Sequence, residues 1–174
     1  NAAETDADVI AATDAVLADV ILRQRPKADA QTSRQLFVVV QSEGRALQAS
    51  DPVGCASLLD GRGAPGLAKV LTPAMVAQSR VAGAKLLVQT ATQPHAPAAP
   101  MTMDKLLEIS MQAVSTLPEV QQETVLRLLR SEKDPVTLEE GRAMCAFNLA
   151  LTDVVLEQSP QAAGDQVRAF WAMQ

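Results

Sequence analysis

The segment AMCAFNLALTDVVL, residues 143–156, places apolar side chains on nearly every side of a helix predicted over residues 137–158. A helix that is apolar all round is usually buried by other elements on every side. The segment therefore predicts an all-α fold in which this helix lies at the centre of a bundle. Thr137 and Glu140 have the spacing of a capping box, which marks where the helix begins.

The rest of the chain also has helical periodicity and composition. Hydrophobic residues make up 48% of the chain but aromatic residues only 2%, so helices are expected to pack through small side chains. Ala, Leu, Met, Gln, Glu and Arg are good helix formers. Further helices are predicted over residues 4–24, over 29–49, where Asp29 is the N-cap, and over 103–117. Four more are predicted to begin at Asp51-Pro52, at Thr72-Pro73, at a second capping box formed by Thr116–Glu119, and at Ser159-Pro160. Together they form a bundle of about six to eight helices.

Two details of these helices are open to other interpretations. The Val-rich stretch of residues 36–40 also fits a buried strand, but its flanks favour a helix and no other segment offers a partner strand. Gly83 lies on an apolar stripe, where it either permits a close helix crossing or simply lowers helix propensity.

A proline-rich segment divides the chain into two helical halves. Residues 93–103 contain three prolines within seven positions, which excludes a helix there and predicts an extended linker. We expect residues 1–92 and 104–174 to be two helical halves that pack together across this linker as one compact domain.

The charge distribution excludes one class of partner. The net charge is −5, and residues 93–174 carry the whole deficit, with eleven acids against six bases. Nucleic-acid binding needs a basic stripe that displaces counterions, and the sequence has none. The acidic half would suit a basic partner protein, although mild acidity commonly serves only to keep a protein in solution.

Cys55 and Cys145 are the strongest chemical signal, with one cysteine in each half. A disulfide between them would close a long loop and join the halves, which is worth about 4–5 kcal/mol in the chain-entropy model. The alternative is two buried free thiols that act as small hydrophobic side chains. The disulfide is the preferred interpretation, and it favours an oxidising compartment.

Catalytic, cofactor and metal sites are not expected. Tetrahedral zinc needs about four ligands at short spacing, whereas this chain has two distant cysteines and one histidine. That histidine, His95, lies between two prolines of the linker, where a general base would not be held in place. The glycine-rich stretch of residues 60–66 follows no strand and contains a proline, so it is a loop and not a phosphate-binding motif.

The candidate interface residues are carboxylates of the central helix and aromatics of the last one. Each has a structural alternative: acids in a first helical turn favour the macrodipole, later acids sit on a solvated face, and aromatics dock the last helix on the core. Asn148 and Thr152, inside the apolar helix, need hydrogen-bond partners on a neighbouring helix, in a cavity or at an interface. The candidates are Glu139, Glu140, Asp153, Glu157, Phe170 and Trp171.

Three functions remain, in order of preference. The first is a non-catalytic exported protein that binds a partner protein, for example an immunity or inhibitor protein that neutralises a toxin. The second is a helical carrier or sensor of a small apolar ligand, with its six methionines among the residues that could line a cavity. The third is a hydrolase that uses carboxylates such as Asp153.

The compartment is predicted from the first residue and from the cysteines. The chain begins at Asn1 instead of Met, which suggests a removed export signal or lipoprotein leader, or else a trimmed tag or a domain cut from a longer protein. The sequence predicts no transmembrane segment, and a lipid anchor upstream would fit. We therefore expect a periplasmic or otherwise exported protein, with the cytoplasm as the alternative.

Overall fold

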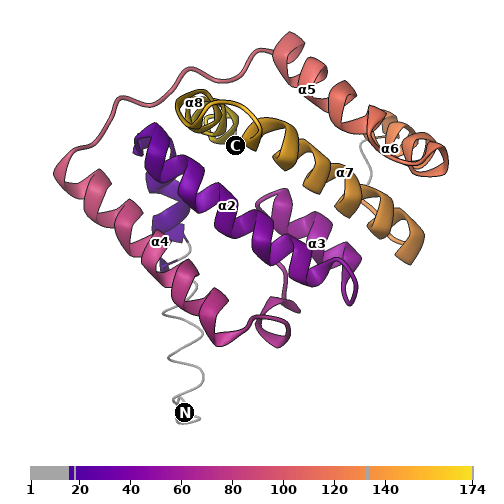
Figure 1. The fold of residues 1–174 in the computed structure, drawn as a ribbon, viewed down its shortest axis with the longest axis horizontal. Helices are drawn as coiled ribbons and strands as arrows, with labels where there is room; N and C mark the ends of the chain where they lie inside the picture. The colour runs from indigo at the N-terminus through magenta and orange to yellow at the C-terminus, as the bar shows by residue number, and fades with distance from the viewer. Residues whose placement is uncertain (1–15, 18, 132–133, 174) are drawn as a thin grey trace, which may run out of the picture.

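The computed structural model describes residues 16–17, 19–131 and 134–173, and all regular secondary structure in these ranges is helical (Figure 1). The predicted all-α bundle is therefore confirmed. Most of the helix predicted over residues 4–24 lies outside the described residues, but residues 19–24 are helical and lead into the first 3-10 turn. The elements are η1 (Arg25–Lys27), α2 (Ala30–Leu47), α3 (Pro52–Leu59), η2 (Leu67–Lys69), α4 (Pro73–Thr92), α5 (Met103–Ser115), α6 (Glu119–Ser131), α7 (Leu138–Leu156) and α8 (Pro160–Trp171).

Short polar side chains begin most of these helices, as the sequence predicts. Each N-cap oxygen accepts the backbone N–H three residues later, which satisfies a donor that the helix itself leaves free. The capping box of Thr137 and Glu140 forms in full at the start of α7. The caps are Asp29, Asp51, Thr72, Thr102, Thr137 and Ser159.

The second predicted capping box, at Thr116–Glu119, is wrong. Thr116 has helical backbone angles and closes α5, and its hydroxyl donates to the carbonyl oxygen of Ala113 instead of capping α6. α6 begins only at Glu119. The reason is Pro118, because the residue before a proline avoids the α region and Leu117 therefore cannot be the first residue of a helix.

Helix α7 is the central element of the bundle, as its sequence predicts. It contacts α2, α3, α5, α6 and α8, and Figure 1 shows it running between α3 and the α5–α6 pair. Its buried side chains are distributed around its circumference and include Met144, Phe147 and Val155. No helix among the described residues is long and apolar enough to cross a membrane.

The two halves share one core. α2 packs on α8 and α3 packs on α7, and the rings of Phe37 and Trp171 pack in a T-shaped arrangement at a centroid distance of 6.5 Å. The larger core cluster takes buried side chains from both halves. The halves are thus packed together, whereas the exact residue ranges assigned to them stay a prediction.

The proline-rich linker is extended, and it is anchored along its length. The N–H of His95 donates to the carbonyl oxygen of Lys27, and Arg168 donates to the carbonyl oxygen of Ala96 at 2.7 Å. The N–H of Met101 donates to Ala169 in α8 at 3.1 Å. The linker therefore lies against η1 and α8, along the edge of the fold that Figure 1 shows between α4 and α5.

Two glycines that the sequence analysis did not single out make the closest helix crossings. A Cβ on Gly164 of α8 would collide with the backbone of Ala30 at the start of α2. A Cβ on Gly141 of α7 would come within 3.0 Å of the backbone nitrogen of Val53 in α3. Gly83 is buried in α4, but a Cβ there would meet only the side-chain tip of Ile21, at 3.3 Å.

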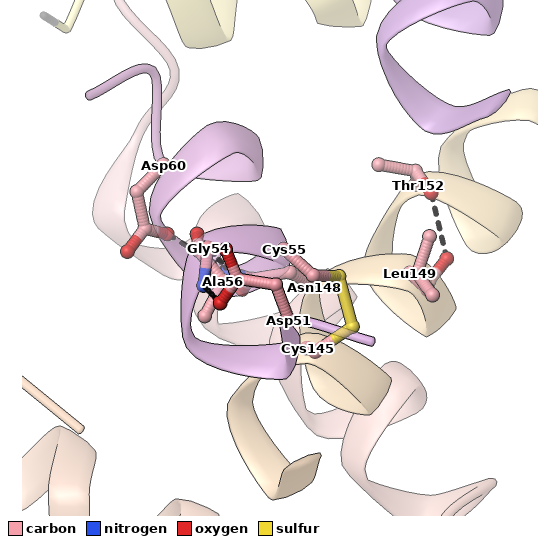
Figure 2. The surroundings of a disulfide bond; sticks show 9 residues. All are labelled: Asp51, Gly54, Cys55, Ala56, Asp60, Cys145, Asn148, Leu149 and Thr152. Atoms are coloured by element: carbon pink, nitrogen blue, oxygen red, sulfur yellow. Dashed lines mark hydrogen bonds between the residues drawn. A yellow bond between two sulfur atoms is a disulfide. The ribbon is translucent and has the colours of Figure 1, made fainter. Parts of the chain in front are cut away.

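The predicted disulfide between Cys55 and Cys145 is present and joins α3 to α7 (Figure 2). Both cysteines are fully buried, and their Cα atoms are 5.4 Å apart. Beside them, the side-chain amide of Asn148 donates to the carbonyl oxygen of Ala56 and to the carboxylate of Asp60. The buried asparagine therefore takes its partners from α3, one of the outcomes expected from its place in the sequence.

Candidate functional site

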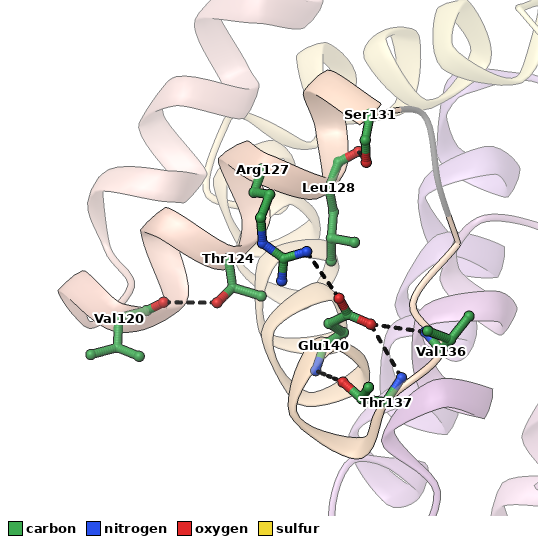
Figure 3. Close-up of polar contacts among 8 residues, drawn as sticks. All are labelled: Val120, Thr124, Arg127, Leu128, Ser131, Val136, Thr137 and Glu140. Atoms are coloured by element: carbon green, nitrogen blue, oxygen red, sulfur yellow. Dashed lines mark hydrogen bonds and ion pairs between the residues drawn. The ribbon is translucent and has the colours of Figure 1, made fainter.

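The two carboxylates that open α7 have different surroundings. Glu139 is exposed. Glu140 accepts the backbone N–H groups of Val136 and Thr137, both at 3.2 Å, and pairs with Arg127 of α6 at 3.0 Å (Figure 3). These hydrogen bonds, that from Val136 first, hold the pKa of the Glu140 carboxyl below its ordinary value. Glu140 thus has a structural task, which is to start α7 and tie it to α6.

The two carboxylates near the end of α7 make different contacts. Asp153 binds one guanidinium nitrogen of Arg45 at 2.6 and 2.8 Å and accepts the side-chain amide of Gln41 at 2.7 Å. These contacts link α7 to α2 at a half-exposed position. Glu157 is exposed and forms the C-cap of α7.

The two aromatic candidates belong to the packing of α8. Trp171 is only 6% exposed and packs against Phe37 in a T-shaped arrangement, so the core covers nearly all of its side chain. Phe170 is partly buried against the same core cluster. The candidates also do not gather at one place, since Glu139 and Asp153 lie about 21 Å apart along α7 at 1.5 Å per residue.

A different site lies between α2, α3, α4 and the helical residues 19–24. There the structure has a cavity of about 310 Å³, bordered also by the loop of residues 61–63. Its walls are mainly apolar, and four polar side chains, Arg25, Glu43, Arg62 and Ser79, reach it from four different segments. The apolar wall consists of Ile21, Leu22, Leu36, Val39, Val40 and Leu58.

Glu43 is the most unusual of the polar residues, because it is a carboxylate only 6% exposed. Its Oε1 accepts the hydroxyl of Ser79 at 2.8 Å. Burial raises the pKa of the Glu43 carboxyl above its ordinary value, while the hydrogen bond from Ser79 and the positive charge of Arg25 oppose this shift. A buried charge without a charged partner is costly, so it is a candidate for a functional role.

Arg25 lines the same cavity as Glu43. Its guanidinium carbon lies 5.2 Å from the centre of the Trp171 ring, a cation–π contact. Burial lowers the pKa of Arg25 from its ordinary value, and the charge of Glu43 opposes this shift. Among the described residues the guanidinium donates no hydrogen bond, and its buried Nε has no partner there. Arg25 and Glu43 therefore line one cavity without forming an ion pair with each other.

Arg62 at the rim is already neutralised. It pairs with Asp60 at 2.9 Å and with Asp134 at 2.5 Å, and these two hydrogen bonds raise its pKa. Its position depends on Gly61 and Gly63, whose φ angles of 82° and 77° are in the left-handed region that favours glycine. The predicted glycine loop thus holds a side chain at the mouth of the cavity.

The chemistry of this site favours binding. Glu43 is the one carboxylate among the lining residues that the structure describes, whereas glycoside hydrolysis by carboxylates uses two. Among the described residues no group of three or more His, Cys, Asp or Glu side chains could hold a metal ion. Apolar walls with a few convergent polar groups are instead typical of a small-molecule site.

Arg25 and Glu43 were not among the residues predicted from the sequence, although Glu43 carries one signal. Leu36, Val40, Glu43 and Leu47 follow each other at spacings of three and four, so the carboxylate falls within the apolar stripe of its helix. A charge inside such a stripe is the pattern of a buried polar group. Arg25 has no comparable signal, because its burial depends on Trp171 in the other half.

Comparison with protein-family models, curated proteins and solved structures finds no match to this chain. The geometry of the cavity is therefore the basis for assigning a function.

Proposed function

We propose that this chain is a non-catalytic binding protein whose cavity at Glu43 holds a small amphipathic molecule. The observation that carries the proposal is the buried carboxylate of Glu43, which lines a mainly apolar cavity together with a guanidinium that it does not pair with. Apolar side chains in place of Glu43 would fill this space with a smaller loss of stability, because a buried charge without an ion pair lowers stability. A ligand that binds the carboxylate of Glu43 and the guanidinium of Arg25 would account for both buried charges.

The disulfide supports an exported location for this function. A fully buried bond between Cys55 and Cys145 persists in an oxidising compartment such as a periplasm and is rare in the reducing cytosol. In this proposal the protein acts as a carrier or sensor outside the cytosol.

The test is a titration of ¹⁵N-labelled protein with 1-hexanol, followed by amide chemical shifts. We expect saturable shifts at residues around the cavity, such as Val40, Gly61 and Gly83. Gly83→Leu, which directs a side chain toward Ile21, should abolish them, whereas Ala84→Leu on the exposed side of α4 should not.

Val40→Phe fills the cavity from the opposite wall and provides a second blocking variant if Gly83→Leu unfolds the protein. Binding that survives both folded variants would contradict the proposal. So would the absence of saturable shifts with hexanol and with its charged and zwitterionic analogues described below.

Partner-protein binding, including the immunity or inhibitor form, is the second candidate, and a stripe on α5 favours it. Met103, Leu107 and Met111 recur every four residues and are 70%, 61% and 49% exposed, so one face of the helix is apolar and open. Asp104 and Glu108 lie beside it, which suits a basic partner. A photo-crosslinking amino acid at residue 107 should capture one basic protein in stoichiometric yield in cells. If the same amino acid at an exposed position on α4 captured that protein in equal yield, the apolar stripe on α5 would not be the binding surface.

A further inference from the structure

The charges in the cavity identify the class of ligand, if the proposed function holds. Arg25 and Glu43 carry opposite charges and line the same space, but no ion pair joins them. The third charged residue, Arg62, has its charge balanced by Asp60 and Asp134. The cavity therefore presents one positive and one negative group that attract each other at a distance, although neither forms an ion pair with a described residue.

Glu43 has room for one strong donor. Ser79 occupies Oε1, while Oε2 receives no hydrogen bond from any described residue. A carboxylate oxygen in a cavity of low dielectric binds an ammonium group strongly, since hydrogen bonds between ionised groups are about twice as strong as neutral ones. An ammonium group also carries three donors, so it can bond Glu43 and still reach neighbouring oxygen atoms.

Arg25 has room for an acceptor pair. The guanidinium carbon of Arg25 lies over the Trp171 ring, 5.2 Å from its centre, so a cation–π contact holds the group beside the indole. The N–H groups at the edge of a guanidinium form a rigid fork that matches the two oxygens of a carboxylate. Within the described part of the chain no carboxylate or carbonyl oxygen fills that fork, so a ligand carboxylate would complete it.

The apolar wall and the size of the cavity limit the remainder of the ligand. The volume of about 310 Å³ is near the lower end for ligand cavities. Leu36, Val39 and Leu58 offer only apolar contacts. The ligand thus has a short hydrocarbon portion in addition to its charged groups.

A ligand with a single charge fits this site less well. A cation would pair with Glu43 but would leave Arg25 without a partner and be repelled by it. An anion would pair with Arg25 but would leave Glu43 without a partner and be repelled by it. Because an unpaired charge in a mainly apolar cavity is costly, a molecule that pairs with both groups binds more favourably than either single ion.

We propose that the cavity binds a zwitterionic amino acid with an apolar side chain, its ammonium on Glu43, its carboxylate on Arg25 and its side chain against the Leu and Val wall. The two charged residues then act as positioning groups for recognition, and the apolar wall selects the side chain. This proposal rests on the proposed function, because it names the ligand of the same cavity.

The experiment compares four probes that share one short chain, by isothermal titration calorimetry on the full chain. Norleucine carries both charges, pentylamine is norleucine without its carboxylate, hexanoate is norleucine without its amine, and 1-hexanol has neither charge. We expect norleucine to bind at least about tenfold more tightly than each of the other three, since each good charged hydrogen bond is worth about 1.5–3 kcal/mol.

Variants assign each charge to its residue. Glu43→Gln should weaken the binding of norleucine and pentylamine but not that of hexanoate. Arg25→Lys keeps a cation beside Trp171 but removes the guanidinium fork, so it should weaken the binding of norleucine and hexanoate but not that of pentylamine. Glu139→Gln and Arg80→Lys make the same substitutions at exposed positions and should leave all four affinities unchanged.

The outcomes separate the two proposals. If 1-hexanol binds as tightly as norleucine and cavity-filling variants block both, the cavity is a binding site but the zwitterion inference is overturned. If none of the four probes binds, both proposals fail. Tight norleucine binding that Glu43→Gln and Arg25→Lys leave unchanged would also overturn the inference, because the charges would then play no part in recognition.

Discussion

Loss of the disulfide between Cys55 and Cys145 should lower the stability of this protein by an amount that its position in the chain defines. The bond closes a loop of 90 residues. In the chain-entropy model a loop of this length restricts the unfolded chain by about 4.6 kcal/mol at 25 °C. For a chain of this size that corresponds to a fall in melting temperature of about 10–20 °C.

The assay is urea unfolding of the oxidised protein and of protein reduced under denaturing conditions and refolded with reductant. Reduction leaves both sulfur atoms in the core, so the comparison isolates the crosslink from the packing of its side chains. The reduced protein should unfold at lower urea with a steeper dependence, because its unfolded chain exposes more surface. A Cys55→Ala/Cys145→Ala variant serves as a thiol-free control.

A particular result would refute this reasoning. If the oxidised and reduced proteins unfold at the same urea concentration, the crosslink does not restrict the unfolded state as assumed. Reduction of the folded protein should also be slow, because both sulfurs are fully buried and the bundle must open before a reductant reaches them.

Three further predictions follow from helix crossings, burial and capping. Gly164→Ala should lower the free energy of unfolding by roughly 1–3 kcal/mol in chemical denaturation, because the added Cβ meets the backbone of Ala30. Gly44→Ala should change it by less than about 1 kcal/mol, because the added Cβ meets only side-chain atoms of Leu59. Burial raises the pKa of Glu43 in the folded protein. The stability that its protonated form contributes is therefore present below the ordinary glutamate pKa and is lost as pH rises through the folded pKa. Thermal melts between about pH 4 and pH 8 should show this loss of stability, and Glu43→Gln should remove the pH dependence. Thr137→Ala should cost about 1 kcal/mol by calorimetry because it removes the N-cap of α7, and an unchanged melting temperature would contradict that role.

Local signals made the helices predictable from the sequence. A capping side chain followed by proline, as at Asp51-Pro52 and Ser159-Pro160, determines a helix start through contacts within four residues. The central place of α7 could also be predicted, since a segment apolar on all sides has no face to present to water. The one false capping box, at Thr116, arose because the spacing of its residues was weighed without the backbone restriction that Pro118 imposes.

The site was harder to predict because it depends on contacts between distant segments. The place of Glu43 within the apolar stripe indicates a buried carboxylate, but its partner Ser79 comes from α4 and cannot be read from that stripe. Arg25 precedes a proline and could equally be a solvated helix end, but Trp171, far along the chain, covers it. Conversely, Trp171 resembled an interface residue because an isolated aromatic near a terminus does not reveal which helix it packs against.

The most direct test of the central claim is a set of intermolecular nuclear Overhauser effects from the terminal methyl group of bound norleucine. The account predicts contacts with methyl groups of Leu36, Val39 and Leu58 on the cavity wall. Contacts with Leu107 on the exposed stripe of α5, or saturable binding without any contact to the cavity wall, would contradict it.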